Sequence, residues 1–158
     1  LLGDTIQFTG TFPFRVKVSG RIKHYINAFG EEVVVENTDS AIAEACRLTG
    51  ATVVDYTAAP VYFSGNDNGA HEWLVEFDVA PANMESFADK LDNALRQVNS
   101  DYDAKRYKDI ALRRLIIHAL PRGTFNEWLR SKGKLGGQHK VPRLSNDRII
   151  LEELLGMV

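Results

Sequence analysis

An amphipathic helix pattern lying between two strand patterns is the feature of this sequence that most restricts its fold. Apolar residues recur at i, i+3, i+4 and i+7 from Met84 to Val98, directly after Asn83, a residue type that caps helices. Residues 72–79 alternate between apolar and polar and predict a strand, and a further strand is predicted at 112–120. The apolar stripe of the helix must be buried, so we expect it to pack across a sheet containing both strands.

The segment before this unit predicts a second helix between strands. A valine-rich strand is predicted at 32–36, and Thr38 is expected to cap a helix that ends before Gly50. A long strand follows at 51–63. The predicted order is strand, helix, strand, strand, helix, strand and then two helices. It predicts an α+β fold: a small mixed sheet in ferredoxin-like strand and helix order, with the helices mainly on one face.

The last part of the chain predicts two short helices. Thr124 and Glu127 form a capping-box pattern for the first helix, and Asn146 is expected to cap the second. A glycine-rich loop at 133–137 lies between them. The polar segment 99–109, which follows the long helix, is interpreted as a solvated loop.

The first thirty residues predict a separate strand-rich lead-in. Strands are predicted at 5–9 and 12–19 with a tight turn at 10–11, and a short strand is predicted at 25–29. The chain begins with Leu1 rather than Met, and a strand pattern starts almost at once. We therefore expect a piece of a longer protein, although a processed or trimmed start would give the same pattern.

Composition excludes several classes of function. The 158 residues suffice for one domain with a core, and a net charge of -2 argues against a nucleic-acid-binding surface. No apolar run approaches the roughly 18 residues that span a bilayer, so no membrane partner is expected. A single cysteine, Cys46, cannot form an internal disulfide, which is typical of a protein from the cytoplasm.

Common catalytic motifs are missing from the sequence. It contains no phosphate-binding loop of the Walker type and no GxGxxG after a strand, and its four scattered histidines do not form a metal-binding pattern, so no metal site is predicted. Three short segments remain as candidates: Gly3-Asp4 at the head of a strand, the region from Arg21 to Gly30, and Lys140 after the glycine-rich loop. A lysine on such a loop could deliver positive charge to a phosphate.

Residues 3–37 resemble the junction between the large and small domains of acyl-adenylate-forming enzymes. They read GDTIQFTGTFPFRVKVSGRIKHYINAFGEEVVVEN. That superfamily has a Gly-Asp on a strand, followed by an arginine, a charged hinge residue and a loop ending in glycine. The corresponding residues here are Asp4, Arg21, Lys23 and Gly30. The resemblance implies that residues 1–22 end the large adenylating domain and the hinge, and that 23–158 form the small C-terminal lid.

Three further motifs narrow the resemblance to the auxin-responsive-promoter (Gretchen Hagen three) family of acyl-acid amido synthetases. The family motif Asn-Ser-x-Tyr-x-x-x-Arg matches residues 99–106, and a Gly-Thr-Phe helix start matches 123–125. The family motif Gln-Tyr-Lys-x-Pro-Arg matches 138–143, where His139 replaces the tyrosine. The resemblance covers nearly the whole chain.

The resemblance implies a ligase that acts in two steps. The full enzyme would bind ATP with Mg²⁺, mainly through the large domain, and convert a carboxylic acid to an acyl-adenylate with release of pyrophosphate. An amino acid would then displace AMP and form an amide. A carboxylate is a poor acyl donor because an oxide ion is a poor leaving group. Adenylation makes the phosphate ester AMP the leaving group instead. The chain alone would be inactive, and the acid and amino acid cannot be named from this sequence.

The resemblance also implies a role for each site residue. Asp4 would accept hydrogen bonds from the two ribose hydroxyls, and Arg21 would contact ribose or phosphate. Lys23 would lie at the hinge between the domains, and Gly30 would let the backbone approach the second substrate. Lys140 would approach the α-phosphate during adenylation.

Two alternatives stay open at this point. In the wider superfamily the catalytic lysine directly follows a glycine, so Lys134, which follows Gly133, competes with Lys140 for this role. The predicted order of elements also suits a stand-alone α+β ligand-binding or dimerisation module. Such a module would not need Asp4 or the hinge segment around Arg21, so the lead-in distinguishes the two functions.

Overall fold

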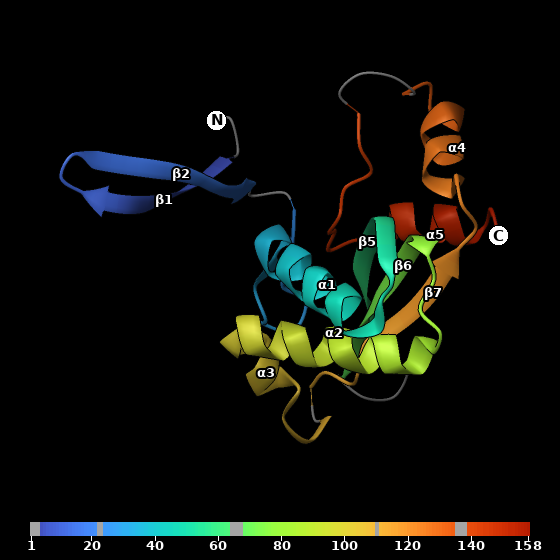
Figure 1. Cartoon of the computed structure of the whole chain (residues 1–158), viewed down its shortest axis with the longest axis horizontal. Coiled ribbons are helices and arrows are strands. Elements are labelled where there is room, and N and C mark those ends of the chain that lie inside the picture. Colours follow the sequence, from blue (N-terminus) through green and yellow to red (C-terminus); the bar gives the residue numbers. More distant parts are fainter. Residues whose placement is uncertain (1–3, 22–23, 64–67, 110, 135–138) are drawn as a thin grey trace.

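A three-stranded mixed sheet forms the centre of the molecule (Figure 1). The structure is a computed structural model that describes residues 4–21, 24–63, 68–109, 111–134 and 139–158. Strand β5 (Thr52–Tyr62) runs antiparallel to β6 (Gly69–Val79), and β6 runs parallel to β7 (Ile116–Leu120). The predicted α+β class with a small mixed sheet is confirmed.

The central strand β6 is buried on both faces. Trp73, Val75 and Phe77 alternate along the strand and belong to one hydrophobic core, whereas Leu74 belongs to a second core. The alternation that predicted this strand is thus a division between two buried faces, and does not mark a face exposed to water.

Two long helices cover the first face of the sheet (Figure 1). They are α1 (Val35–Thr49) and α2 (Met84–Val98). The side chain of Asn83 accepts a hydrogen bond of 2.9 Å from the backbone N–H of Ser86, which confirms the predicted cap of α2. The predicted apolar stripe is also confirmed, since the buried residues of α2 include Phe87, Ala88, Leu91, Ala94 and Leu95.

Two short helices cover the second face. These are α4 (Thr124–Ser131) and α5 (Ile149–Leu155). Their core consists of Ala59, Leu74, Leu120, Phe125, Trp128, Leu129, Val141, Leu151 and Leu154. The helices therefore lie mainly on one face, as predicted, but the short C-terminal pair closes the other.

The predicted strand at 32–36 is wrong in most of its length. Only Val33–Val34 forms a strand, β4, and it pairs with β3 (Tyr25–Ile26) instead of joining the central sheet. Helix α1 begins at Val35 because the backbone N–H of Val34 donates to the side chain of Asn37, so Thr38 lies inside the helix. The order of elements matches the prediction, but the first strand does not enter the sheet.

The polar segment after α2 is helical and not a solvated loop. It forms α3 (Ser100–Lys105) and the 3₁₀ helix η1 (Tyr107–Asp109), and Asn99 caps α3 by accepting from the N–H of Tyr102 at 2.7 Å. The strand predicted at 112–120 is correspondingly shorter and begins at Ile116.

Neither predicted cap of the short helices forms. At α4 the hydroxyl of Thr124 donates to the carbonyl of Pro121, and the buried carboxylate of Glu76 accepts from the N–H groups of Gly123 at 2.7 Å and Phe125 at 3.4 Å. A side chain from the neighbouring strand thus replaces the local cap.

At α5 the N-cap is Arg148, and Asn146 serves another contact. Its side chain donates to the carbonyl of Tyr25 at 3.1 Å and accepts from the N–H of Asn27 at 2.8 Å. Asn146 therefore joins the C-terminal segment to the loop after β3.

A hairpin at the start of the chain projects away from the rest of the structure (Figure 1). It consists of β1 (Asp4–Thr11) and β2 (Phe14–Arg21), so its turn lies at 12–13 and not at the predicted 10–11. The hairpin exposes apolar side chains, including Ile6, Phe8, Phe12, Phe14 and Val16. Within the described part of the chain, nothing covers them.

Candidate functional site

The base of the hairpin carries two of the predicted site residues. In the antiparallel register Asp4 and Arg21 are direct partners, so their backbones lie opposite one another where the hairpin joins the domain. Lys23, the predicted hinge residue, lies outside the described residues. The register is compatible with a shared ligand at Asp4 and Arg21, and this remains a prediction.

Gly30 lies on an exposed loop between β3 and β4. Its φ angle of +82° is one that residues with a side chain rarely adopt, and an added Cβ would lie 3.2 Å from the amine of Lys105. The φ angle requires glycine for local structure, whereas the flexible lysine side chain can move away from an added Cβ. Gly30 is also exposed, which is what the predicted acceptor role would need.

Lys140 is exposed on a segment that is fixed to the edge of the sheet. Leu144 in this segment forms a parallel bridge with Ala58 of β5, and the N–H of Ala58 donates to the carbonyl of Arg143 at 2.9 Å. Val141 and Leu144 are buried in different cores. The amine of Lys140 therefore extends from a segment whose C-terminal part is held against the sheet.

Lys134, the alternative lysine, lies at the end of α4. It is exposed, and its backbone N–H donates to the carbonyl of Leu129 at 2.9 Å, just after Gly133 with a φ angle of +65°. Gly133 closes the end of the helix here, so local structure alone accounts for the position of Lys134. The choice of Lys140 stays a prediction.

A cluster of polar side chains lies beside the Lys140 segment. The guanidinium of Arg143 contacts both carboxylate oxygens of Asp39 at 2.5 and 2.6 Å and lies 5.2 Å from the ring centre of Tyr56. The hydroxyl of Tyr56 donates to Asp39 at 2.6 Å, and the Nε of Arg143 lies 3.8 Å from Asp55. This cluster connects the Lys140 segment to α1 and β5.

The charge of Lys140 is one of those that act on Asp55. Burial raises the pKa of Asp55, and the N–H of Tyr56 and the positive charges of Arg143 and Lys140 oppose that rise. Burial and the hydrogen bond to Asp39 raise the pKa of Tyr56 far above neutral pH, so its hydroxyl remains a donor. No carboxylate of the described residues forms an ion pair with Lys140.

A pocket lies next to this cluster. Its volume is about 350 Å³, and it opens between α1 and β5 with Asp39, Asp55 and Arg143 in its wall. The half-buried thiol of Cys46 also lines it, and burial raises the pKa of that thiol, so the cysteine remains protonated and inert.

Lys140 and Gly30 lie at opposite ends of β5. The loop of Gly30 approaches the end of the strand, where the ring of Phe29 packs on Tyr62 at 5.1 Å between centres, whereas Lys140 influences Asp55 near its start. Seven residues of extended strand separate Asp55 from Tyr62, a distance of roughly 23 Å. The structure does not bring these two predicted site residues together.

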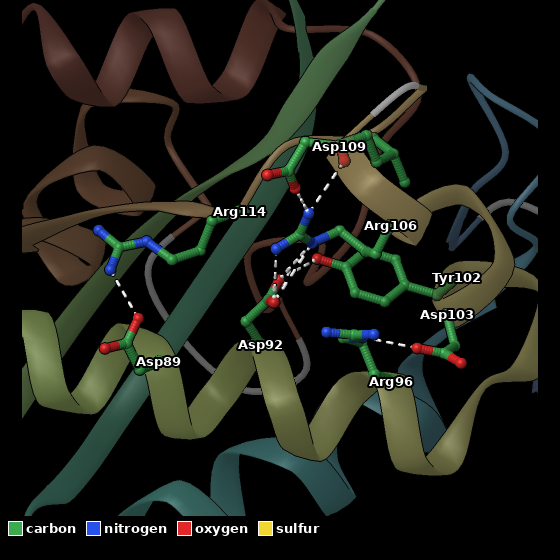
Figure 2. A network of polar contacts seen from close by, with 9 residues as sticks. Asp89, Asp92, Arg96, Tyr102, Asp103, Arg106, Asp109 and Arg114 are labelled. Carbon is green, nitrogen blue, oxygen red and sulfur yellow. Dashed lines mark hydrogen bonds and ion pairs between the residues drawn. The ribbon is translucent and has the colours of Figure 1, made fainter.

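The motif at 99–106 is a buried structural network (Figure 2). Asp92 of α2 accepts from the Nε of Arg106 at 2.9 Å, from its Nη2 at 2.9 Å and from the hydroxyl of Tyr102 at 2.7 Å. Arg106 also donates to Asp109 and to the carbonyl of Leu112. All three principal side chains are buried.

Arg106 stays charged and Tyr102 stays neutral at ordinary pH values. Although desolvation alone would lower it, the pKa of Arg106 is raised by the hydrogen bonds and the charge of Asp92. Burial, followed by the charge of Asp92, raises the pKa of Tyr102 well above its usual range. Tyr102 and Arg106 therefore anchor α3 to α2.

A buried contact between a histidine and a glutamate was not predicted from the sequence. His71 of β6 and Glu31 are both fully buried, with 2.8 Å between Nε2 and Oε1. Burial by itself raises the pKa of Glu31, but the hydrogen bond and charge of His71 and the N–H of Phe29 lower it overall. The two residues are 40 positions apart, so no local pattern could indicate the contact.

The described residues contain neither a metal cluster nor a membrane span. Within the described ranges, no three His, Cys, Asp or Glu side chains lie close enough to hold a metal ion. No helix in that part of the chain is both long and apolar enough to cross a bilayer.

Two solved structures with the same fold are both described as acyl acid amido synthetases. A GH3.15 acyl acid amido synthetase superimposes with a TM-score of 0.76 at 21% identity, and the structure described as AtGH3.15 acyl acid amido synthetase in complex with 2,4-DB gives 0.73 at 18%. Each similarity covers 98% of this chain but only 29% of the other, so the chain spans less than a third of those proteins. The fold is that of the C-terminal part of such an enzyme.

The family follows from the sequence match. The model of the GH3 family C-terminal domain matches residues 36–149, and the chain therefore belongs to this family. No curated protein matches the chain in sequence. The resemblance that the sequence motifs indicated is confirmed at the level of the family.

Proposed function

We propose that this chain is the C-terminal lid of an ATP-dependent acyl-acid amido synthetase. The observation that carries the proposal is the agreement of the family match with a fold shared, over nearly the whole chain, with acyl acid amido synthetases. In the proposed reaction a carboxylic acid is adenylated and its acyl group is transferred to an amino acid. The division at residues 22 and 23 between the end of the large domain and the lid is part of this proposal.

Lys140 is the proposed catalytic group of the lid. Its exposed amine forms no ion pair with a described carboxylate and extends from an anchored backbone, which suits approach to a phosphate. Negative charge develops around the α-phosphate when the acid's carboxylate attacks it and pyrophosphate leaves. A positioned ammonium group offsets that charge.

Asp4 and Arg21 are the proposed nucleotide contacts. Their register as direct cross-strand partners supports a common ligand, with the carboxylate accepting from the ribose hydroxyls and the guanidinium contacting ribose or phosphate. Mg²⁺ would accompany ATP, and its ligands would come mainly from the rest of the longer protein.

Lys23 and Gly30 complete the proposed site. Gly30 would border the acceptor amino acid, because it is exposed and has no side chain that would keep a substrate away from the backbone. Lys23 would lie at the hinge that lets the lid present first Lys140 and then the loop of Gly30. The cytoplasm is the proposed location, and the single thiol of Cys46 is in keeping with it.

The hairpin supports the lid function over a stand-alone binding module. Phe8, Phe12 and Phe14 are 63%, 100% and 78% exposed, and isolated domains rarely present such a contiguous apolar face to water. A large domain that packs on the hairpin would cover this face.

An exchange assay tests the proposal. The full-length protein containing this chain should catalyse exchange of labelled pyrophosphate into ATP only when a suitable carboxylic acid is added. A panel of aryl, alkyl and fatty acids covers the unknown substrate. Absence of acid-dependent exchange across the panel, in a folded protein, would reject the proposed reaction.

A further inference from the structure

Arg143 holds the segment that carries Lys140 in place, and its contacts are too specific for a solvated surface arginine. One nitrogen of its guanidinium contacts both oxygens of Asp39, and the group stacks over the ring of Tyr56. Asp39 in turn accepts from the Tyr56 hydroxyl, and Tyr56 also contacts the hydroxyl of Thr38 at 2.6 Å. Tyr56, which lies under the guanidinium and donates to Asp39, is thus itself held from two sides.

The backbone around Arg143 is fixed at the same place. The N–H of Ala58 donates to the Arg143 carbonyl, the N–H of Ser145 donates to the Ala58 carbonyl at 3.1 Å, and the hydroxyl of Thr57 donates to the carbonyl of Pro142 at 2.7 Å. Lys140 is three residues away from Arg143. A change in the Arg143 contact is therefore transmitted to Lys140 through a short and otherwise rigid segment.

Arg143 also lies close to the two carboxylates beside the Lys140 segment. Asp39 and Asp55 both lie beside the segment, and Arg143 contacts the first and lies 3.8 Å from the second. The Lys140 charge acts on Asp55 without forming an ion pair. Without the guanidinium, two carboxylates would attract the Lys140 ammonium and hold it away from a phosphate.

We propose that Arg143 is a positioning residue for adenylation, which fixes the Lys140 segment against Asp39 and Tyr56 and leaves the lysine amine free for the α-phosphate. The inference rests on the proposed function. Arg143 does not itself touch the substrate in this proposal, and its effect passes through Lys140.

Because Arg143 is partly exposed, its proposed role can be tested without a large loss of stability. The side chains of Arg143 and Asp39 are 37% and 44% exposed, and ion pairs of that exposure contribute little to folding. Arg143→Gln should therefore leave the melting temperature of the full-length protein nearly unchanged. Misplacement of a catalytic group by about 1 Å can lower a rate by roughly 100-fold, so we expect adenylation to fall about 10- to 100-fold.

The test compares the two half-reactions in the full-length protein. Arg143→Gln and Asp39→Asn should both slow acid-dependent pyrophosphate exchange, whereas amide formation from supplied acyl-adenylate should stay within about twofold. Arg47→Gln is the matched control, because it removes another exposed arginine–carboxylate pair on α1, with Glu44, and should change neither step. Equal loss in both half-reactions would overturn the proposal.

A double variant decides whether Arg143 acts through Lys140. If it does, Arg143→Gln combined with Lys140→Ala should exchange no more slowly than Lys140→Ala alone. Multiplied losses would mean that Arg143 acts independently of Lys140, which overturns the positioning role. Exchange at the unaltered rate in Lys140→Ala would reject that lysine together with this inference, and absence of exchange in the unaltered protein would reject the proposed function itself.

Discussion

Replacing Arg106 with methionine should remove a large part of the stability of this domain. The guanidinium makes three contacts with the Asp92 carboxylate, at 2.9, 3.2 and 2.9 Å, and the two side chains are only 7% and 5% exposed. Methionine fills part of the same volume but leaves the carboxylate with only the Tyr102 hydroxyl as a side-chain donor. Removal of one partner from a buried ion pair costs about 3–5 kcal/mol, so we expect a loss of that size in the free energy of unfolding.

Urea unfolding of the 158-residue chain measures this loss. Trp73 and Trp128 are both buried and report unfolding by fluorescence, and urea adds no salt that would screen the ion pair. Arg96→Met is the matched control, because it removes a more exposed arginine–carboxylate pair close to the same network. Its partner is Asp103, and their side chains are 38% and 50% exposed, so the expected loss is below about 1 kcal/mol.

A second variant separates the buried charge from packing. In Arg106→Met combined with Asp92→Leu, no buried carboxylate remains unpaired, and the double variant should be more stable than Arg106→Met alone. A loss below about 1 kcal/mol in Arg106→Met, or a double variant less stable than the single one, would refute the reasoning from the buried ion pair.

Three further predictions concern a close contact, a pH dependence and the nucleotide. Gly69→Ala should lower the free energy of unfolding by about 1–3 kcal/mol, because the added Cβ would lie 2.1 Å from the carbonyl oxygen of Val61. Gly156→Ala, whose Cβ would have contacts of 3.5 Å, should be nearly neutral, and thermal melts compare the two variants. The pKa of Glu31 is lower in the folded state than its ordinary value of 4.5, so its contribution is present above that pH and is lost as pH falls through the folded value. Glu31→Gln should accordingly flatten the acid limb of stability against pH, and an unchanged acid limb would contradict this. Asp4→Ala in the full-length protein should raise the Michaelis constant for ATP at least about tenfold, and an unchanged constant would remove Asp4 from the site.

The sequence predicted those elements whose cause is local. Helix α2 has both an apolar stripe and a capping asparagine within its own residues, and both are present in the structure. Gly50 likewise ends α1 with a φ angle of +71°. The start of α1 was missed because Val33, Val34 and Val35 favour a strand individually, whereas the side chain of Asn37 turns the chain into a helix.

Tertiary contacts explain the wrong caps. Thr124 and Asn146 are residue types that cap helices, but Glu76 supplies the acceptor at α4 and Asn146 contacts Tyr25. Each partner comes from an element distant in the sequence, and local patterns carry no information about it. The segment 99–109 was missed for the same reason, since its polar residues are satisfied by a buried partner on α2.

The candidate site was predictable only in part. Lys140 and Arg143 were found from a motif, but Asp39, which explains the arginine, is 104 positions away and had no sequence signal of its own. The motif at 99–106 was equally recognisable, although its Tyr102 and Arg106 are buried and structural. A family motif therefore identifies residues that matter without separating those that bind substrate from those that support the fold.

The separation of Lys140 and Gly30 along β5 has a consequence for the timing of the proposed reaction. Two groups that lie beside opposite ends of a strand segment roughly 23 Å long cannot serve the same atom at the same moment. In the proposed reaction the acceptor loop would be withdrawn while the lysine is engaged, so an amine would be admitted only after ATP has been consumed. The length of a single strand would in this way impose the chemical sequence, activation first and acyl transfer second.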